Sequence, residues 1–141
     1  MSKSIPTVLH VEDECNDRLL MKIAFKKAGA RVDMRGVEDG EEALDYLQGL
    51  GAYANRGQYP FPKLVLLDLK LPRKSGLEIL AWIRSRPELK NLPVVILSSS
   101  EQTVDQQRAS ELGASHYFVK PVSVQPLRKI AAEINSQRLA H

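Results

Sequence analysis

The sequence has a single cysteine, Cys15, and therefore cannot form a disulfide within the chain. It has no apolar run that approaches the ~18 residues of a membrane-spanning helix, and nothing in it resembles a signal peptide. It also has no run of five like charges, because its basic residues are scattered and its net charge is only +3. We therefore expect a cytoplasmic protein without a membrane anchor, and its charge pattern does not indicate a nucleic-acid-binding surface.

The apolar content is sufficient for one core. Of the 141 residues, 43% are hydrophobic and 26% charged, which is ordinary for a globular domain that buries its core without disulfides. We expect one domain over residues 1–141, with its core from about residue 5 to residue 134 and short tails at both ends. We expect no DNA-binding output domain, because no residues remain for one after Ile134.

The most informative stretch runs from Lys63 to Pro72. Residues 64–67 are all apolar and show no alternation, which is typical of a strand buried on both faces of a parallel sheet. Asp68 follows directly. Because an ionised carboxylate is costly to bury, we expect Asp68 where the strand ends and the sheet opens to solvent. In open α/β sheets, ligands bind at that edge.

The rest of the chain alternates between strand-like and helix-like segments. Strand patterns lie near residues 7–11, 31–37, 93–97 and 115–119, and helix patterns follow Asn16, Asp39, Ser75, Glu101 and Ser123. Five strands alternating with five helices predict an α/β fold with a parallel sheet. Right-handed crossovers with helices on both faces predict a doubly wound sheet of order 2-1-3-4-5, with the polar second strand at an edge.

Helical spacing also predicts which faces of the helices are buried. We expect Asp39 and Ser75 to cap their helices, each with a glutamate three residues on. The expected buried sets in the first and fourth helices are Leu20, Ile23, Ala24 and Ala28, and Val104, Ala109 and Leu112.

Polar residues end four of the five strands: Glu12 and Asp13 the first, Asp68 the third, Ser98 the fourth and Lys120 the fifth. Because the first and third strands are neighbours in the expected order, three carboxylates would crowd into one crevice. A hard divalent cation would offset their repulsion, and Mg²⁺ is usual where a phosphoryl group shares the site. With a lysine and a hydroxyl nearby, the set predicts a phosphoryl site in which a carboxylate can be the nucleophile.

Each of these residues alone also fits an ordinary role. Acidic residues favour helix N-termini, a lysine is usually solvated, and serines are common in loops. Their joint placement at four strand ends favours the phosphoryl site.

As a set, these motifs resemble the receiver domain of two-component response regulators, such as the chemotaxis response regulator. The resemblance covers about residues 5–134 and rests on Glu12-Asp13, on Asp68 within Leu-Leu-Asp-Leu-Lys-Leu-Pro, on Ser98 and on Lys120-Pro121. It implies a flavodoxin-like fold and a stand-alone phosphoacceptor signalling protein, not an enzyme that acts on other substrates.

The resemblance also implies a role for each site residue. Asp68 would accept a phosphoryl group from the phosphohistidine of a sensor histidine kinase. Asp13 would bind Mg²⁺ directly and Glu12 through water, with Asp68 and the backbone carbonyl of Lys70 as further ligands. Lys120 would contact the phosphoryl group, and the peptide bond between Lys120 and the proline after it is a candidate for the cis isomer.

The response to phosphorylation is implied in the same way. Ser98 and Tyr117 match the hydroxyl and aromatic positions that shift together on activation. The signal would pass through the surface of the fourth helix, fifth strand and fifth helix. Related proteins often form homodimers through this face, for which the candidates here are Tyr117, Phe118, Val122 and Val124. Lys70 and Ser100 lie where the family sets the lifetime of the phosphoryl group.

The connection over residues 50–62 is long for a helix-to-strand loop. Together with Asp45-Tyr46-Leu47 before it and Tyr59-Pro60 within it, it resembles single-domain regulators that are paired with bacterial phytochrome kinases. The alternative is an insertion with no specific role.

Other functions fit less well. A dehalogenase-type phosphatase also uses an aspartate at a strand end, but it needs a second aspartate where this chain has Lys70. A flavodoxin-type cofactor module is disfavoured because the glycine pattern at residues 49–54 follows a helix and not a strand. Cys15 lies close to acidic residues, which raise the pKa of a thiol, so it is a poor nucleophile. We expect His10 to be a core residue.

Overall fold

Five short segments form the sheet that the sequence predicts. The computed structural model describes residues 5–121 and 123–139. The strands are β1 (Thr7–Val11), β2 (Asp33–Val37), β3 (Leu64–Leu67), β4 (Val94–Ser98) and β5 (His116–Val119). They are parallel and lie in the order β2-β1-β3-β4-β5, so the predicted doubly wound sheet is confirmed. The central strands β1, β3 and β4 are buried along their whole length, whereas the edge strand β2 is mostly half-buried.

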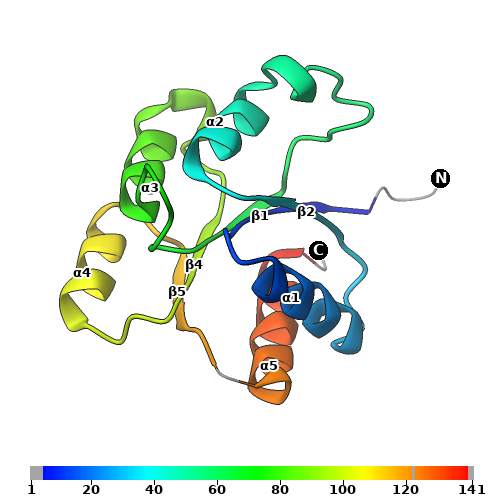
Figure 1. Cartoon of the computed structure of the whole chain (residues 1–141), viewed down its shortest axis with the longest axis vertical. Helices are drawn as coiled ribbons and strands as arrows, with labels where there is room; N and C mark the ends of the chain where they lie inside the picture. Colours follow the sequence, from blue (N-terminus) through cyan, green and yellow to red (C-terminus); the bar gives the residue numbers. More distant parts are fainter. Residues whose placement is uncertain (1–4, 122, 140–141) are drawn as a thin grey trace.

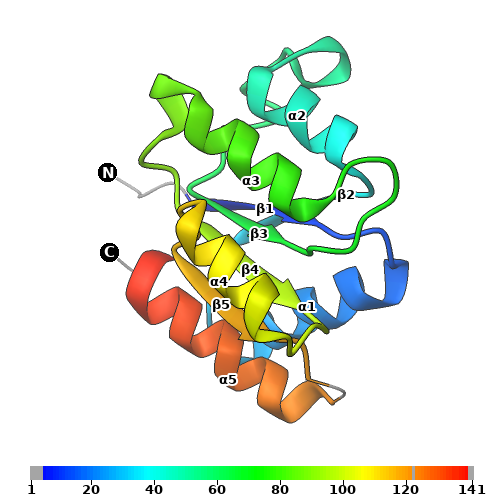
Figure 2. The same ribbon diagram turned by 90° about the vertical axis from the view of Figure 1, so that its left-hand side faces the viewer.

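The helices cover the two faces of the sheet, as Figures 1 and 2 show. One face carries α1 (Cys15–Lys27) and α5 (Val124–Ile134), and the other carries α2 (Gly40–Gln48), α3 (Gly76–Ser85) and α4 (Thr103–Glu111). Single helical turns lie at Gly51–Tyr53 and Pro87–Leu89, and the π-helical segment Asn135–Leu139 extends α5. No helix in the described residues is long and apolar enough to cross a membrane.

Strand side chains alternate between two cores because successive residues point to opposite faces. In β1, for example, Leu9 and Val11 pack toward α2, α3 and α4, whereas Val8 packs toward α1 and α5. His10 shares the α1 side of the sheet and is buried, as expected. Burial, reinforced by the charges of Lys120 and Arg18, lowers the pKa of His10 to about 3, so the imidazole is neutral near pH 7.

Two predicted helix faces are wrong. In α1 the buried residues are Met21, Ala24 and Phe25, and Leu20 is 37% exposed. The true and the predicted faces share Ala24, so helical spacing alone does not choose between them. In α4 only Ala109 is buried, and Val104 is 55% exposed. The start of α4 is therefore not held by apolar packing.

The predicted caps at Asp39 and Ser75 are confirmed. Asp39 Oδ1 accepts a hydrogen bond from the Glu42 amide at 2.8 Å, and Ser75 Oγ accepts one from the Glu78 amide at 3.2 Å. Ser123 is the N-cap residue of α5, but its side chain makes no capping hydrogen bond.

The loop over residues 50–62 packs on α2 through its aromatic side chains. The rings of Tyr46, Tyr53 and Tyr59 have their centroids 4.8–6.2 Å apart. Tyr46 Oη donates to the Pro60 carbonyl at 2.9 Å, and Tyr53 Oη donates to Glu42 Oε1 at 2.7 Å. The loop is therefore part of the folded structure.

Candidate functional site

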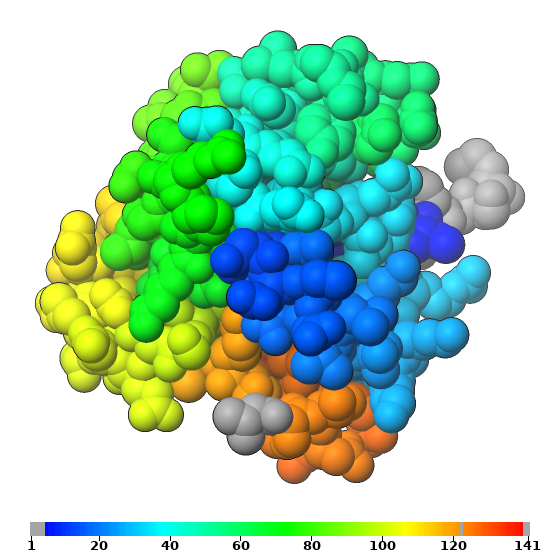
Figure 3. Space-filling model, in the orientation of Figure 1, coloured from blue at the N-terminus to red at the C-terminus, as the bar shows by residue number. Residues whose placement is uncertain are grey.

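The carboxyl edge of the sheet brings the predicted site residues together, and backbone hydrogen bonds between neighbouring strands hold Asp68 and Lys120 there. The Asp68 amide donates to the Val11 carbonyl at 3.1 Å, which sets Asp68 beside Glu12. The Lys120 amide donates to the Ser98 carbonyl at 2.7 Å, which sets those two residues side by side. In Figure 3 the start of α1 (blue), the loop after β3 (green) and the chain after β5 (orange) meet on one face of the molecule.

Three carboxylates form a candidate cation site. Glu12, Asp13 and Asp68 each offer an oxygen, and these oxygens all lie within 4.8 Å of one another. Glu12 and Asp68 are buried, whereas Asp13 is exposed, so the group opens to solvent on one side. An all-oxygen set with this charge suits a hard divalent cation such as Mg²⁺ or Mn²⁺. We refer to these three residues as the carboxylate triad.

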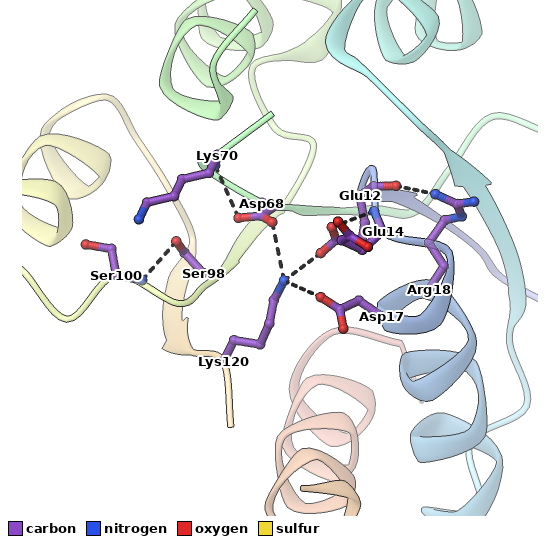
Figure 4. Close-up of polar contacts among 9 residues, drawn as sticks. All are labelled: Glu12, Glu14, Asp17, Arg18, Asp68, Lys70, Ser98, Ser100 and Lys120. Carbon is purple, nitrogen blue, oxygen red and sulfur yellow. Dashed lines mark hydrogen bonds and ion pairs between the residues drawn. The ribbon is translucent and has the colours of Figure 1, made fainter. Parts of the chain in front are cut away.

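Lys120 partly offsets the negative charge of the carboxylate triad. Its Nζ donates to Glu12 Oε1 at 2.6 Å, to Asp17 Oδ2 at 3.0 Å and to Asp68 Oδ2 at 3.3 Å (Figure 4). Burial opposes the charge of Lys120, but its hydrogen bond to Glu12 and the charge of Asp68 outweigh burial and raise its pKa above the ordinary value. Lys120 is therefore a firmly charged ammonium.

Glu12 is held at both carboxylate oxygens. Oε1 accepts from Lys120, and Oε2 accepts from the Glu14 amide at 3.1 Å. Burial nevertheless raises the pKa of Glu12 to about 7, with the charge of Asp68 adding to the effect, while both hydrogen bonds act in the opposite direction. A bound cation would favour the ionised form.

The loop after β3 folds tightly against Asp68. The Lys70 amide donates to Asp68 Oδ1 at 3.2 Å and thereby orients the carboxylate. A Cβ on Gly76 would lie 2.2 Å from the Asp68 carbonyl oxygen, so this close approach requires glycine. The Lys70 side chain is exposed and, in Figure 4, lies on the same side of Asp68 as Ser98 and Ser100.

Ser98 and Tyr117 are connected through Ser100. The fully buried Ser98 hydroxyl accepts from the Ser100 amide at 3.2 Å. Tyr117 Oη donates to the Ser100 carbonyl at 3.0 Å, and Ser100 Oγ donates to Asp105 Oδ2 in α4 at 2.6 Å. One loop thus links the site to both β5 and α4.

Sequence reasoning missed Asp17. It lies in the first turn of α1, and its contact with Lys120 brings α1 into the site. The available signal was its place in the first turn of a helix that starts at the sheet edge.

The expected cis peptide bond is wrong, since the bond between Lys120 and Pro121 is trans. Of the proposed dimer-face residues, Tyr117, Phe118 and Val124 are half-buried, and Val122 lies outside the described residues.

The family model of the response regulator receiver domain matches residues 8–132. The chain belongs to this family. Response regulator Rcp1 of Synechocystis is 36% identical to this receiver domain, over 92% of this chain and 86% of that protein. Membership of this family agrees with the strand order. It also agrees with the acidic, hydroxyl and lysine side chains that lie together at one edge of the sheet.

Solved structures of receiver domains superpose closely. The response regulator RPA3017, from red light signalling in R. palustris, has a TM-score of 0.88 at 35% identity and covers 93% of this chain and 92% of its own. The phosphorylated cyanobacterial phytochrome response regulator RcpA has a TM-score of 0.85 at 36% identity, over 94% of this chain and 93% of its own. The Mn²⁺-bound form of Rcp1 has a TM-score of 0.83 at 36% identity, with the same coverage.

Proposed function

We propose that this receiver domain accepts a phosphoryl group on Asp68 from the phosphohistidine of a sensor histidine kinase, in a reaction that depends on Mg²⁺. The observation that carries the proposal is that Asp68 contacts both parts of the site. It belongs to the carboxylate triad and also lies 3.3 Å from the Lys120 ammonium. A nucleophile between a cation site and a fixed ammonium is suited to phosphoryl transfer.

In this mechanism an oxygen of Asp68 attacks phosphorus, the P–N bond to the kinase histidine breaks, and the imidazole keeps the bond's electron pair and takes up a proton. The Lys70 amide orients the attacking carboxylate, and Lys120 offsets the charge on the transferred oxygens. Glu12, Asp13, Asp68 and the Lys70 backbone carbonyl would hold Mg²⁺. Bound there, the metal would supply further charge neutralisation.

The phosphorylated state would be communicated by the loop after β4. A phosphoryl group on Asp68 offers acceptor oxygens to the Ser98 hydroxyl, which now accepts from the Ser100 amide. A shift of Ser98 would therefore displace Ser100 and its bond to Tyr117. The proposed output is a two-state change of the surface formed by α4, β5 and α5, which is also the proposed homodimer face.

A phytochrome-type light sensor is the proposed kinase. The folded aromatic loop over residues 50–62 supports this, because the sequence resemblance to phytochrome-linked regulators rests on it. The similarity to RcpA, which is a phytochrome response regulator, adds support.

Mass spectrometry tests the chemistry. The protein is treated with acetyl phosphate and Mg²⁺, and we expect the intact mass to rise by one phosphoryl group in the wild type but not in Asp68→Asn. An unmodified wild type, or an adduct that persists in Asp68→Asn, would contradict the mechanism. Gel filtration before and after phosphorylation tests the dimer, and a monomer in both states would reject it.

A further inference from the structure

Lys120 divides its contacts between two kinds of carboxylate. Glu12 and Asp68 belong to the carboxylate triad, so a bound cation would require the same groups that now accept from Lys120. Asp17 lies outside the triad and reaches Lys120 from α1 (Figure 4). Two cations that share two carboxylates compete for them, and they also repel each other.

We propose that Asp17 is a positioning residue that retains the Lys120 ammonium when the carboxylate triad binds its cation. With the cation bound, Glu12 and Asp68 would serve as ligands of the metal, and Asp17 would remain as the anionic partner of Lys120. Mg²⁺ and the ammonium can then occupy the site together. This inference rests on the proposed function, because it explains how the phosphoryl site accommodates both cations.

Among the described residues, Asp17 is the one ion-pair partner of Lys120 that lies outside the carboxylate triad. On the α1–α5 side Lys120 lines a cavity of about 180 Å³, and apart from Glu12 and Asp17 no other described residue that lines it carries a carboxylate. Its apolar lining residues include Leu20, Met21, Leu97 and Leu127. Within the described residues, the carboxylates in ion-pair distance of Lys120 are Glu12, Asp17 and Asp68. Without Asp17 the ammonium would therefore stay on the two triad carboxylates.

The first turn of α1 holds Asp17 in place. Its neighbour Arg18 donates to the Glu12 backbone carbonyl at 2.6 Å, which ties α1 to the end of β1. The Asp17 side chain is 35% exposed, whereas Lys120 is 18% exposed, so Asp17 lies at the outer side of the pair. Asp17 can therefore pair with Lys120 from outside the carboxylate triad.

Mg²⁺ titration calorimetry tests the role directly. We expect Asp17→Ala to weaken Mg²⁺ binding about tenfold, the size expected for one hydrogen bond between charged groups. Asp17→Asn keeps an acceptor oxygen, so its Mg²⁺ affinity should lie between those of the wild type and Asp17→Ala. Phosphorylation of Asp17→Ala by acetyl phosphate should be slower than that of the wild type at limiting Mg²⁺ and should approach the wild-type rate at saturating Mg²⁺.

A matched control separates position from charge. Glu14→Gln removes the same charge from the same end of α1, but Glu14 is exposed and its side chain has no contact with Lys120 in the described structure. We expect it to change Mg²⁺ affinity less than about twofold, as for an exposed charge. An equal loss in Glu14→Gln and Asp17→Ala would overturn the inference.

A double-mutant cycle tests whether Asp17 acts through Lys120. In a Lys120→Met background, Asp17→Ala should no longer weaken Mg²⁺ binding. The same tenfold loss in that background, or wild-type affinity in Asp17→Ala alone, would overturn the inference. Absence of Mg²⁺ binding by the wild type would instead contradict the proposed function. Thermal unfolding in EDTA establishes that each variant is folded.

Discussion

Lys120 and Arg56 are both partly buried cations, but their partners differ in kind. Lys120 contacts three carboxylates at the carboxyl edge of the sheet. Arg56 donates to the Leu47 carbonyl at 2.9 Å and the Tyr59 carbonyl at 3.3 Å, and it lies over the rings of Tyr46 and Phe61. Two of the carboxylates around Lys120 belong to the carboxylate triad, and one of them is the proposed nucleophile, whereas the carbonyls and rings around Arg56 belong to neither. The comparison therefore separates a reactive site from a structural one.

The chemistry of each side chain fits this division. Lysine is a compact charge on a flexible stem that can follow a moving anion, whereas the planar arginine head spans several fixed acceptors and stacks on rings. The same contrast predicts that a change at Lys120 alters function and a change at Arg56 alters stability.

The largest expected effect is on the rate of phosphorylation. Lys120→Met should slow phosphorylation by acetyl phosphate about 10²-fold or more, because it removes a preorganised charge at the transferred oxygens. A mass-spectrometric time course measures the rate, with Arg56→Met as the matched control, expected within about twofold of wild type. Equal slowing in both variants would erase the distinction between the two cations.

Cation binding should stabilise the folded protein by an amount that does not depend on the loop over residues 50–62. At a Mg²⁺ concentration 100 times the dissociation constant, the free energy of unfolding should rise by about 2.7 kcal/mol, because the folded state alone assembles the triad. Urea unfolding with Mg²⁺ and with EDTA measures this. Arg56→Met should show the same increment, and a smaller one would link the loop to the metal site.

Arg56→Met itself should lower the free energy of unfolding by about 2 kcal/mol. The substitution leaves two backbone carbonyls without their donor and removes two ring contacts, and partial exposure keeps the loss moderate. Urea unfolding in EDTA measures the change. A loss below about 0.5 kcal/mol, the usual range for a surface substitution, would show that the loop packs without Arg56.

The strand ends could be predicted from sequence because sheet topology determines which residues meet. Glu12, Asp68 and Lys120 follow apolar strands, and parallel order brings them to one edge whatever the loops do. Asp17 could not be singled out in this way. Acidic residues in a first helical turn are common for reasons of helix stability alone, and only the rotation of α1 brings this one to Lys120.

Other features depend on choices that spacing leaves open. The buried face of α1 is set by the bulk of Met21 and Phe25, since Ala24 belongs to both candidate faces. The rings of Tyr46, Tyr53 and Tyr59 come together although no single helix or strand contains all three. The order of the aromatic loop arises from tertiary packing between a helix and a loop, for which no local pattern exists.

The smallest expected effect sharpens the comparison within the loop. Tyr53→Phe removes the hydrogen bond to Glu42 at 2.7 Å and should lower the free energy of unfolding by about 1 kcal/mol. Burial, and then the hydrogen bond to Glu42, raise the pKa of Tyr53 in the folded state. Because the unfolded chain then loses this proton more readily, wild-type stability should fall as pH rises above about 10, the ordinary tyrosine value.

Tyr53→Phe should lack that component, so the stability difference between the two proteins should be constant below pH ~10 and shrink above it. Urea unfolding across this range measures the difference, and phosphorylation at neutral pH should be unchanged. A difference that grows with alkaline pH would mean that Tyr53 ionises more easily in the folded protein. In that case the hydrogen bond from Tyr53 to Glu42 would not stabilise the loop over residues 50–62. The contacts of Arg56 with backbone carbonyls and rings would then account for the packing of this loop.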